Sequence, residues 1–171
     1  MKNIILTGFM GAGKTTVGKL LAKEKGMCFV DTDERIVSEQ GREIADIFSK
    51  DGEEYFRDLE TELLLRMQED TYHAVISVGG GMPIRKRNRE LLRNLGCVIY
   101  LSASKQTILE RVKNDGSRPM LNGGELETRV EQLMKDREVF YRQTAHIDIR
   151  TDGRSVRHVL QIIEQETRKF G

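Results

Sequence analysis

The chain has 171 residues, 38% of them hydrophobic, and its 28 Lys and Arg against 27 Asp and Glu give a formal net charge of +1. This balance provides no global field that would draw the protein to nucleic acid or to a membrane surface. The longest apolar run, Cys97 to Leu101, is far shorter than the about 20 residues of a membrane span, and Ile4 to Leu6 is too short for a signal peptide. We therefore expect one cytoplasmic domain over residues 1–171, with Cys28 and Cys97 reduced and buried in the core.

Short β-prone segments alternate with segments of helical periodicity along the chain. The five strand candidates are Asn3 to Leu6, Met27 to Val30, Ala74 to Val78, Cys97 to Leu101 and Ile147 to Ile149. Between them, apolar residues recur at spacings of three and four, the pattern of helices that bury one face. This alternation predicts an α/β fold with a parallel sheet and helices on both faces. The loops that follow the strands then lie at one edge of the sheet, where such folds bind ligands.

The first strand candidate leads into the string GFMGAGKT, residues 8–15, which matches the phosphate-binding pattern GxxxxGK[ST]. The glycines let successive backbone N–H groups point at phosphate oxygens, and the start of the following helix adds a favourable dipole. We expect Lys14 to reach the β- and γ-phosphates and Thr15 to place its hydroxyl on Mg²⁺. The motif predicts nucleotide binding and phosphoryl transfer, but it does not identify the acceptor.

Two carboxylates follow the second strand candidate, in the sequence Asp31-Thr32-Asp33. Residues two apart on a strand point to the same side, so both carboxylates would lie near the phosphate-binding loop. One could hold a water on Mg²⁺, and the other could accept a proton from an attacking hydroxyl and orient it. The alternative is that Asp33 only caps the helix that follows.

The third strand candidate ends in Val78 and three glycines, Gly79 to Gly81. Three glycines lose conformational entropy without packing in the core, so they indicate either close approach of the backbone to a ligand or a tight turn. Residues 114–124, NDGSRPMLNGG, form a polar segment between two helix candidates, which is typical of a lid or of a tolerated surface loop. Arg118 in this segment could stabilise transition-state charge on the γ-phosphate.

Arg137 falls on the apolar face of a helix candidate, four residues after Leu133 and three after Met134. A charge on a buried stripe needs an anionic partner, which could be a ligand or a structural ion pair. Arg57 lies beside the apolar stripe of its own helix, and the pattern does not single it out.

Six motifs occur in the order and near the spacing found in the shikimate kinases: GFMGAGKTT, DTD, FRDLE, SVGGG, Arg118-Pro119 and Arg137 to Tyr141. The chain resembles this family over essentially its whole length. The resemblance implies a P-loop kinase fold with a five-stranded parallel sheet of order 2-3-1-4-5, an acceptor-binding region at about 33–60 and a mobile lid at about 113–125. It also implies transfer of the γ-phosphate of ATP, with Mg²⁺, to the 3-hydroxyl of shikimate, in the biosynthesis of chorismate and aromatic amino acids.

The resemblance further implies roles for residues on the acceptor side. Asp33 would bind the hydroxyls of shikimate and orient the nucleophile. Arg57 and Arg137 would hold the carboxylate of shikimate with their planar guanidinium groups. Gly79, Gly80 and Gly81 would close over the substrate through backbone N–H groups.

On the nucleotide side, the resemblance implies that Thr15 ligates Mg²⁺ and that Asp31 reaches the metal through water. Adenine would lie between Arg111 and the loop at residues 152–154, and Arg118 would contact ATP from the lid. The complete set of expected nucleotide-binding residues is Gly11, Ala12, Gly13, Lys14, Thr15, Thr16, Arg111, Arg118 and Arg154. Of these, Lys14 and Arg118 would act in catalysis together with Asp33.

Other interpretations remain open. A gluconate or nucleoside-monophosphate kinase would share the loop and the general fold. A nucleotide acceptor would not need two arginines at one carboxylate, and gluconate, which does have a carboxylate, is disfavoured by the pairing of DTD with SVGGG. A non-catalytic nucleotide switch would place a water-positioning Gln or Asp near the γ-phosphate, and none is identified. A nucleic-acid-binding protein is disfavoured by the charge and by the absence of Trp. We expect a monomer without nucleic-acid or membrane partners, because the fold needs no partner to bury its core.

Overall fold

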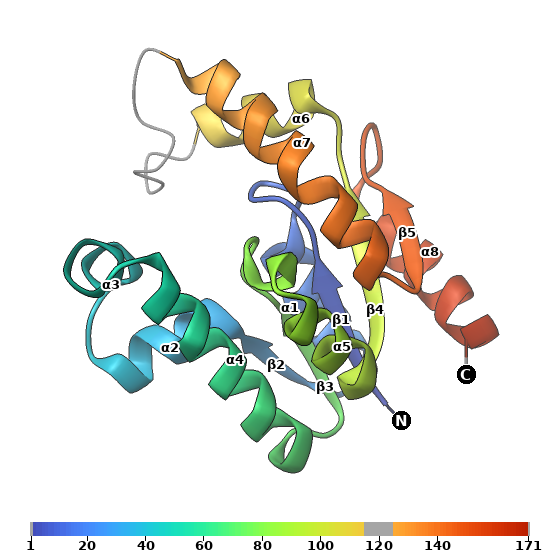
Figure 1. Ribbon diagram of the computed structural model, residues 1–171. Coiled ribbons are helices and arrows are strands. Elements are labelled where there is room, and N and C mark those ends of the chain that lie inside the picture. The colour runs from blue at the N-terminus through green and yellow to red at the C-terminus, as the bar shows by residue number, and fades with distance from the viewer. Residues whose placement is uncertain (1, 115–124, 171) are drawn as a thin grey trace.

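A five-stranded parallel sheet forms the centre of the computed structural model, which describes residues 2–114 and 125–170 (Figure 1). The strand order is β2-β3-β1-β4-β5, and every pair of neighbours is parallel. Each of the five strand candidates is a strand within one residue at either end, so the predicted fold class and strand order are confirmed. The strands are β1 (Asn3–Thr7), β2 (Cys28–Asp31), β3 (Ala74–Ser77), β4 (Gly96–Ser102) and β5 (Ile147–Arg150).

Helices cover both faces of the sheet, with α1 and α8 on one face and α4, α5 and α7 on the other (Figure 1). Helices α2 and α3 precede α4 beyond the β2 edge, and α6 precedes the segment that lies outside the described residues. The helices are α1 (Lys14–Lys25), α2 (Thr32–Gln40), α3 (Ile44–Asp51), α4 (Glu53–Asp70), the short 3₁₀ helix η1 (Met82–Ile84), α5 (Lys86–Leu95), α6 (Lys105–Lys113), α7 (Leu126–Thr144) and α8 (Val156–Phe170).

Alternation along β1 divides the core between the two faces. Ile4 and Leu6 belong to a buried cluster that includes side chains of α1 and α8. Ile5, between them, belongs to a second cluster with side chains of α4 and α5. Because successive side chains of a strand point to opposite faces, one short apolar strand serves both clusters. The sheet is therefore buried on both faces, and polar chemistry is left to the loops at its carboxyl edge.

One expectation about the core is wrong. Cys97 is buried in β4, but Cys28 is exposed, and both thiols are free. Cys28 begins β2, which is an edge strand, so part of its surface is not covered by a neighbouring strand. Apolar neighbours in the sequence therefore do not guarantee burial at this position. Within the described ranges, no helix has both the length and the apolar character needed to cross a membrane.

Candidate active site

The phosphate-binding loop connects β1 to α1, as the motif predicts. Gly8, Gly11 and Gly13 all have positive φ angles, of 149°, 78° and 95°. A Cβ atom on Gly8 would lie 2.5 Å from the backbone oxygen of Leu101, so a side chain is excluded there. Lys14 Nζ folds back over the loop and donates to the backbone oxygens of Gly8 at 2.5 Å and Phe9 at 3.2 Å. The loop thus forms a concave backbone surface at the start of a helix, which suits an anion.

The two aspartates after β2 are arranged differently from the expectation of two neighbours on one strand. β2 ends at Asp31, and Asp33 already lies in the first turn of α2. Asp31 is the residue that caps this helix, because its Oδ1 accepts hydrogen bonds from the backbone N–H groups of Asp33 at 3.0 Å and Glu34 at 3.1 Å. The alternative that Asp33 is the cap is therefore wrong. The helix turn nevertheless brings both carboxylates into one cleft.

That cleft has a volume of about 310 Å³ and lies at the carboxyl edge of the sheet. Segments far apart in sequence contribute to it: the loop after β1, the start of α2, the loop after β3, and helices α4 and α7. It collects all the residues expected on the acceptor side together with Lys14 and the two residues expected at the metal: Lys14, Thr15, Asp31, Asp33, Arg57, Gly79, Gly80, Gly81 and Arg137.

Each of the three glycines after β3 makes room for a different polar side chain. A Cβ on Gly79 would lie 2.6 Å from Asp33 Oδ1, and one on Gly81 would collide with the guanidinium group of Arg57. A Cβ on Gly80 would be 3.4 Å from Arg137 Nη1. The three glycines therefore form the turn before η1 and also let an aspartate and two arginines pack against the backbone.

Arg57 is buried in α4 and is surrounded by carboxylates and aromatic rings. Its Nη1 donates to both carboxylate oxygens of Glu60, at 2.9 and 3.0 Å, and its Nη2 donates to Glu53 at 3.2 Å. The guanidinium carbon also lies 5.4 Å from the ring centroid of Phe56 and 5.9 Å from that of Phe48. These contacts hold the planar group in one orientation at the wall of the cleft.

Glu60 is fully buried beside Arg57 and also lines the cleft. Burial raises the pKa of Glu60 to about 7, although the positive charge of Arg57 acts in the opposite direction. Glu60 is not among the site residues predicted from the sequence. A usable signal was present, because Glu60 comes four residues after Phe56 and three before Leu63, on the apolar face of the helix. This is the same type of pattern that singled out Arg137.

Arg137 is buried on α7, as its position on the apolar face predicts. No ion pair of Arg137 with any other described residue is found, in contrast to Arg57. The neighbouring Tyr141 donates a hydrogen bond of 2.6 Å from its hydroxyl to the backbone oxygen of Gly80. Thr32 makes a second link to this loop, because its buried hydroxyl accepts from the Gly79 N–H at 3.0 Å. Sequence patterns gave no sign of these two supporting contacts.

The residues expected to hold the nucleotide base gather in a second, smaller cleft of about 230 Å³. Arg111 of α6 and Arg154 from the loop before α8 both line it. Arg111 Nη1 donates to the backbone oxygen of Gly11 at 2.8 Å, which ties α6 to the phosphate-binding loop. Ala12, Gly13 and Thr16 line the same cleft. Arg118 belongs to residues 115–124, outside the described part of the chain, so its role stays a prediction.

The oxygen ligands near Lys14 suit Mg²⁺ only when a nucleotide supplies further ligands from its phosphates. Thr15 offers a hydroxyl and Asp31 a single carboxylate in the same cleft, and one oxygen of that carboxylate already caps α2. The residues that the structure describes include no group of three or more His, Cys, Asp or Glu that could hold a metal ion without other ligands. Mg²⁺ commonly takes one or two protein oxygens and completes its shell with water and phosphate oxygens, so the residues fit this ion.

Comparisons with known proteins point to one family. Residues 10–167 match the model of the family described as shikimate kinase. The chain is 43% identical to a shikimate kinase of Symbiobacterium thermophilum over 171 residues, covering 99% of this chain and 98% of the relative. It is 39% identical to a shikimate kinase of Bacillus anthracis, covering 97% of this chain and 98% of the relative.

A solved structure, that of the shikimate kinase from Acinetobacter baumannii in complex with shikimate, matches with a TM-score of 0.92 and 38% identity. The match covers 99% of this chain and 94% of that one. The family model spans most of the sequence, and the sequence relatives and the solved structure both match it along nearly their full length. The chain therefore belongs to the shikimate kinase family.

Proposed function

We propose that this chain transfers the γ-phosphate of ATP to the 3-hydroxyl of shikimate, with Mg²⁺, and that the residues gathered in the 310 Å³ cleft carry out the acceptor side of the reaction. Membership of the shikimate kinase family makes the chain an ATP-dependent kinase, and the product, shikimate 3-phosphate, belongs to the route to chorismate. The residue roles below are the proposal.

The arginines would recognise the carboxylate of the substrate. Arg57 and Arg137 come from different helices and converge on adjacent glycines, Gly81 and Gly80, so that two guanidinium groups face the same part of the cleft. A guanidinium matches a carboxylate with two parallel hydrogen bonds, which fixes orientation as well as charge. Asp33 packs against Gly79, two residues before Gly81, so the Cα atoms against which Asp33 and Arg57 pack are at most about 7 Å apart.

Asp33 would orient the reacting hydroxyl and accept its proton. In phosphoryl transfer, much of the catalysis is positioning of the nucleophile in line with the phosphate, and an aspartate near the hydroxyl serves this purpose. Lys14 would hold the β- and γ-phosphates, and the backbone N–H groups of the loop after β1 would bind the remaining oxygens. Thr15, and Asp31 through water, would hold Mg²⁺, which would neutralise charge on the phosphates when bound.

The nucleotide base would lie in the cleft between Arg111 and the loop before α8, where Ala12, Gly13 and Thr16 also contribute. Because the chain buries both faces of its sheet without a partner, we propose that the enzyme acts as a monomer. Residues 1–171 would then work as one kinase domain, with the acceptor-binding region at about 33–60 and the lid at about 113–125.

The observation that carries this proposal is the convergence of Asp33, Arg57 and Arg137 on three consecutive glycines beside the phosphate-binding loop. The direct test is release of ADP from MgATP by the purified chain, measured with shikimate, gluconate, AMP or no acceptor. We expect release that depends on shikimate alone. Turnover with AMP instead would leave the kinase but contradict the carboxylate clamp, and turnover with gluconate would contradict the choice of shikimate as acceptor. Acceptor-independent release would contradict the acceptor assignments altogether.

A second expectation concerns pH, because Glu60 and the substrate carboxylate compete for Arg57. Burial raises the pKa of Glu60 to about 7, so this group changes charge in the physiological range. Binding of the shikimate carboxylate, which stays ionised here, favours the neutral form of Glu60. We therefore expect the KM for shikimate to rise about three- to tenfold between pH 6 and pH 8, and Glu60→Gln to remove most of this dependence.

The matched control for this experiment is Glu62→Gln, an exposed glutamate on the same helix. It should keep the pH profile of the wild type. The thermal stability provides a second readout. The folded pKa of Glu60 lies above its ordinary value of 4.5, so the stability contribution of this group is full below about 4.5 and is lost as pH rises through about 7. The melting temperature of Glu60→Gln should therefore increase relative to that of the wild type as pH rises. A difference between the two melting temperatures that does not change with pH would contradict the raised pKa of Glu60.

A further inference from the structure

The nucleotide-base cleft has two walls that come from distant parts of the chain. One wall is α6, which carries Arg111, and the other is the loop at residues 151–155, which carries Arg154. The two walls are about 45 residues apart in sequence. Their separation decides how well a flat base fits between them, so whatever joins them controls the shape of the cleft.

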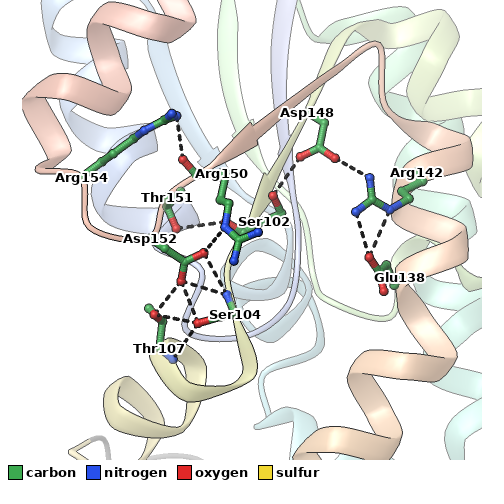
Figure 2. Close-up of polar contacts among 10 residues, drawn as sticks. All are labelled: Ser102, Ser104, Thr107, Glu138, Arg142, Asp148, Arg150, Thr151, Asp152 and Arg154. Carbon is green, nitrogen blue, oxygen red and sulfur yellow. Dashed lines mark hydrogen bonds and ion pairs between the residues drawn. The ribbon is translucent and has the colours of Figure 1, made fainter.

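The side chain of Asp152 joins the two walls (Figure 2). Its Oδ1 accepts from the backbone N–H of Ser104 at 2.9 Å, from the Ser104 hydroxyl at 2.9 Å and from the Thr107 hydroxyl at 2.6 Å. Its Oδ2 accepts from the Ser104 N–H at 3.1 Å and from Arg150 Nε at 2.7 Å. One carboxylate from the loop is thus held by four donor groups, three of which belong to the first turn of α6.

These contacts fix the start of α6. Ser104 is the N-cap of the helix, and its hydroxyl accepts from the backbone N–H of Thr107 at 3.2 Å. A carboxylate at this position is favoured by the helix dipole and by charge-assisted hydrogen bonds. Arg111 follows Thr107 by four residues, about one turn further along the same helix. Arg111 is hydrogen-bonded to the backbone oxygen of Gly11 in the phosphate-binding loop. Contacts therefore fix α6 near its first turn, through Asp152, and near its last turn, through Gly11.

The loop side is equally fixed. The backbone N–H and the hydroxyl of Thr151 both donate to the backbone oxygen of Ser102, at 2.8 and 3.2 Å. The turn that follows is closed by the Arg154 N–H, which donates to the Thr151 oxygen at 3.2 Å, and Arg154 Nη1 donates to the Arg150 oxygen at 2.9 Å. Burial opposes ionisation, but the hydrogen bonds from Thr107 and Ser104 hold the pKa of Asp152 well below its usual range. The carboxylate therefore stays charged at the pH where the enzyme works.

We propose that Asp152 is a positioning residue that sets the spacing between the two walls of the base cleft and thereby the affinity for the nucleotide, without a role at the acceptor. This proposal rests on the proposed placement of the base between Arg111 and the 152–154 loop. Asp152 itself does not line the cleft and acts through Arg111 and Arg154.

Asp148 of β5, four residues before Asp152, provides a matched comparison (Figure 2). It accepts from the Ser102 hydroxyl at 2.9 Å and from Arg142 Nη1 at 2.7 Å, so it has a serine and an arginine as partners, as Asp152 does. Its arginine belongs to α7, and neither of these two partners lies at the start of α6. If these carboxylates matter only for general stability, removal of either should have the same consequences for the enzyme.

The test compares Asp152→Ala, Asp152→Asn and Asp148→Ala. For Asp152→Ala we expect the KM for ATP and the Kd of ADP to rise about tenfold, with the KM for shikimate within about twofold of the wild type. Asp152→Asn keeps an acceptor for Ser104 and Thr107 and should restore most of the affinity. Asp148→Ala should leave the ATP and ADP values unchanged. Inorganic tripolyphosphate, which has no base, should inhibit wild type and Asp152→Ala equally.

Several outcomes would overturn the proposal. These are equal losses for ATP and shikimate, the same loss in Asp148→Ala, weaker tripolyphosphate inhibition in Asp152→Ala, or an unchanged Kd of ADP. Should Asp152→Ala fail to fold, Thr107→Val removes the shortest hydrogen bond to Asp152, together with the one between the Ser104 and Thr107 hydroxyls. It should raise the Kd of ADP about threefold, and an unchanged value would refute the proposal. Arg111→Ala separates this idea from the placement of the base, because ADP affinity unaffected by that variant would show that the placement itself is wrong.

Discussion

Replacement of Asp33 by asparagine is expected to lower kcat about 10²- to 10⁴-fold, while the Kd of ATP stays within about threefold of the wild type. Asparagine has nearly the same shape, so packing against Gly79 is kept, but its amide cannot accept the proton of the attacking hydroxyl. The measurement is steady-state turnover with shikimate, combined with direct titration of the nucleotide.

The control for this prediction is Asp46→Asn. Asp46 lies in the first turn of α3, as Asp33 lies in the first turn of α2, but it is exposed and away from the cleft. Both substitutions remove a negative charge that favours a helix N-terminus, so they should have similar small effects on stability. Only Asp33→Asn should lower turnover. Loss of nucleotide binding in that variant would instead assign Asp33 to the structure or to the metal.

Replacement of Arg137 by lysine should lower kcat/KM for shikimate about 10- to 150-fold, which corresponds to the about 1.5–3 kcal/mol of a hydrogen bond to a charged group. Lysine keeps the positive charge but cannot form the two parallel hydrogen bonds of a guanidinium to a carboxylate. The KM for ATP should change little, because Arg137 lies on the acceptor side. Initial rates at varied shikimate, with ATP saturating, provide the measurement.

Arg142→Lys is the corresponding control on the same helix. Arg142 is exposed and forms surface ion pairs with Glu138 and Asp148. Such pairs contribute little to stability, so this variant should retain normal kinetics. Near-normal shikimate binding by Arg137→Lys would refute the proposed carboxylate clamp, whatever the behaviour of the control.

The strands and the phosphate-binding loop could be predicted because they depend on local signals. A short apolar run identifies a buried strand. Glycines at fixed spacing before Lys14 identify a phosphate-binding loop of one backbone conformation. Arg137 could also be found, since a charge on an apolar helix face is rare and demands a partner. All these inferences use residues that are close in sequence, where spacing determines geometry.

Features that depend on distant contacts could not be predicted in the same way. Arg57 is buried because Glu60 pairs with it and because Phe48 of α3 packs near it, and no spacing around Arg57 reveals that helix. The geometry predicted for the two aspartates after β2 is wrong for a different reason. The strand gives way to α2 at Thr32, so the extended geometry that relates residues two apart does not apply to Asp31 and Asp33. A boundary of one residue changes which carboxylate is the cap.

The three glycines after β3 also limit how the acceptor cleft can change during evolution or engineering. Gly79, Gly80 and Gly81 have no side chains to shorten, so this wall cannot retreat to admit a bulkier acceptor. Any substitution there adds atoms, and at Gly79 and Gly81 those atoms would meet Asp33 and Arg57 first. New acceptor preferences must therefore arise from other side chains that line the cleft, such as Ile44 of α3.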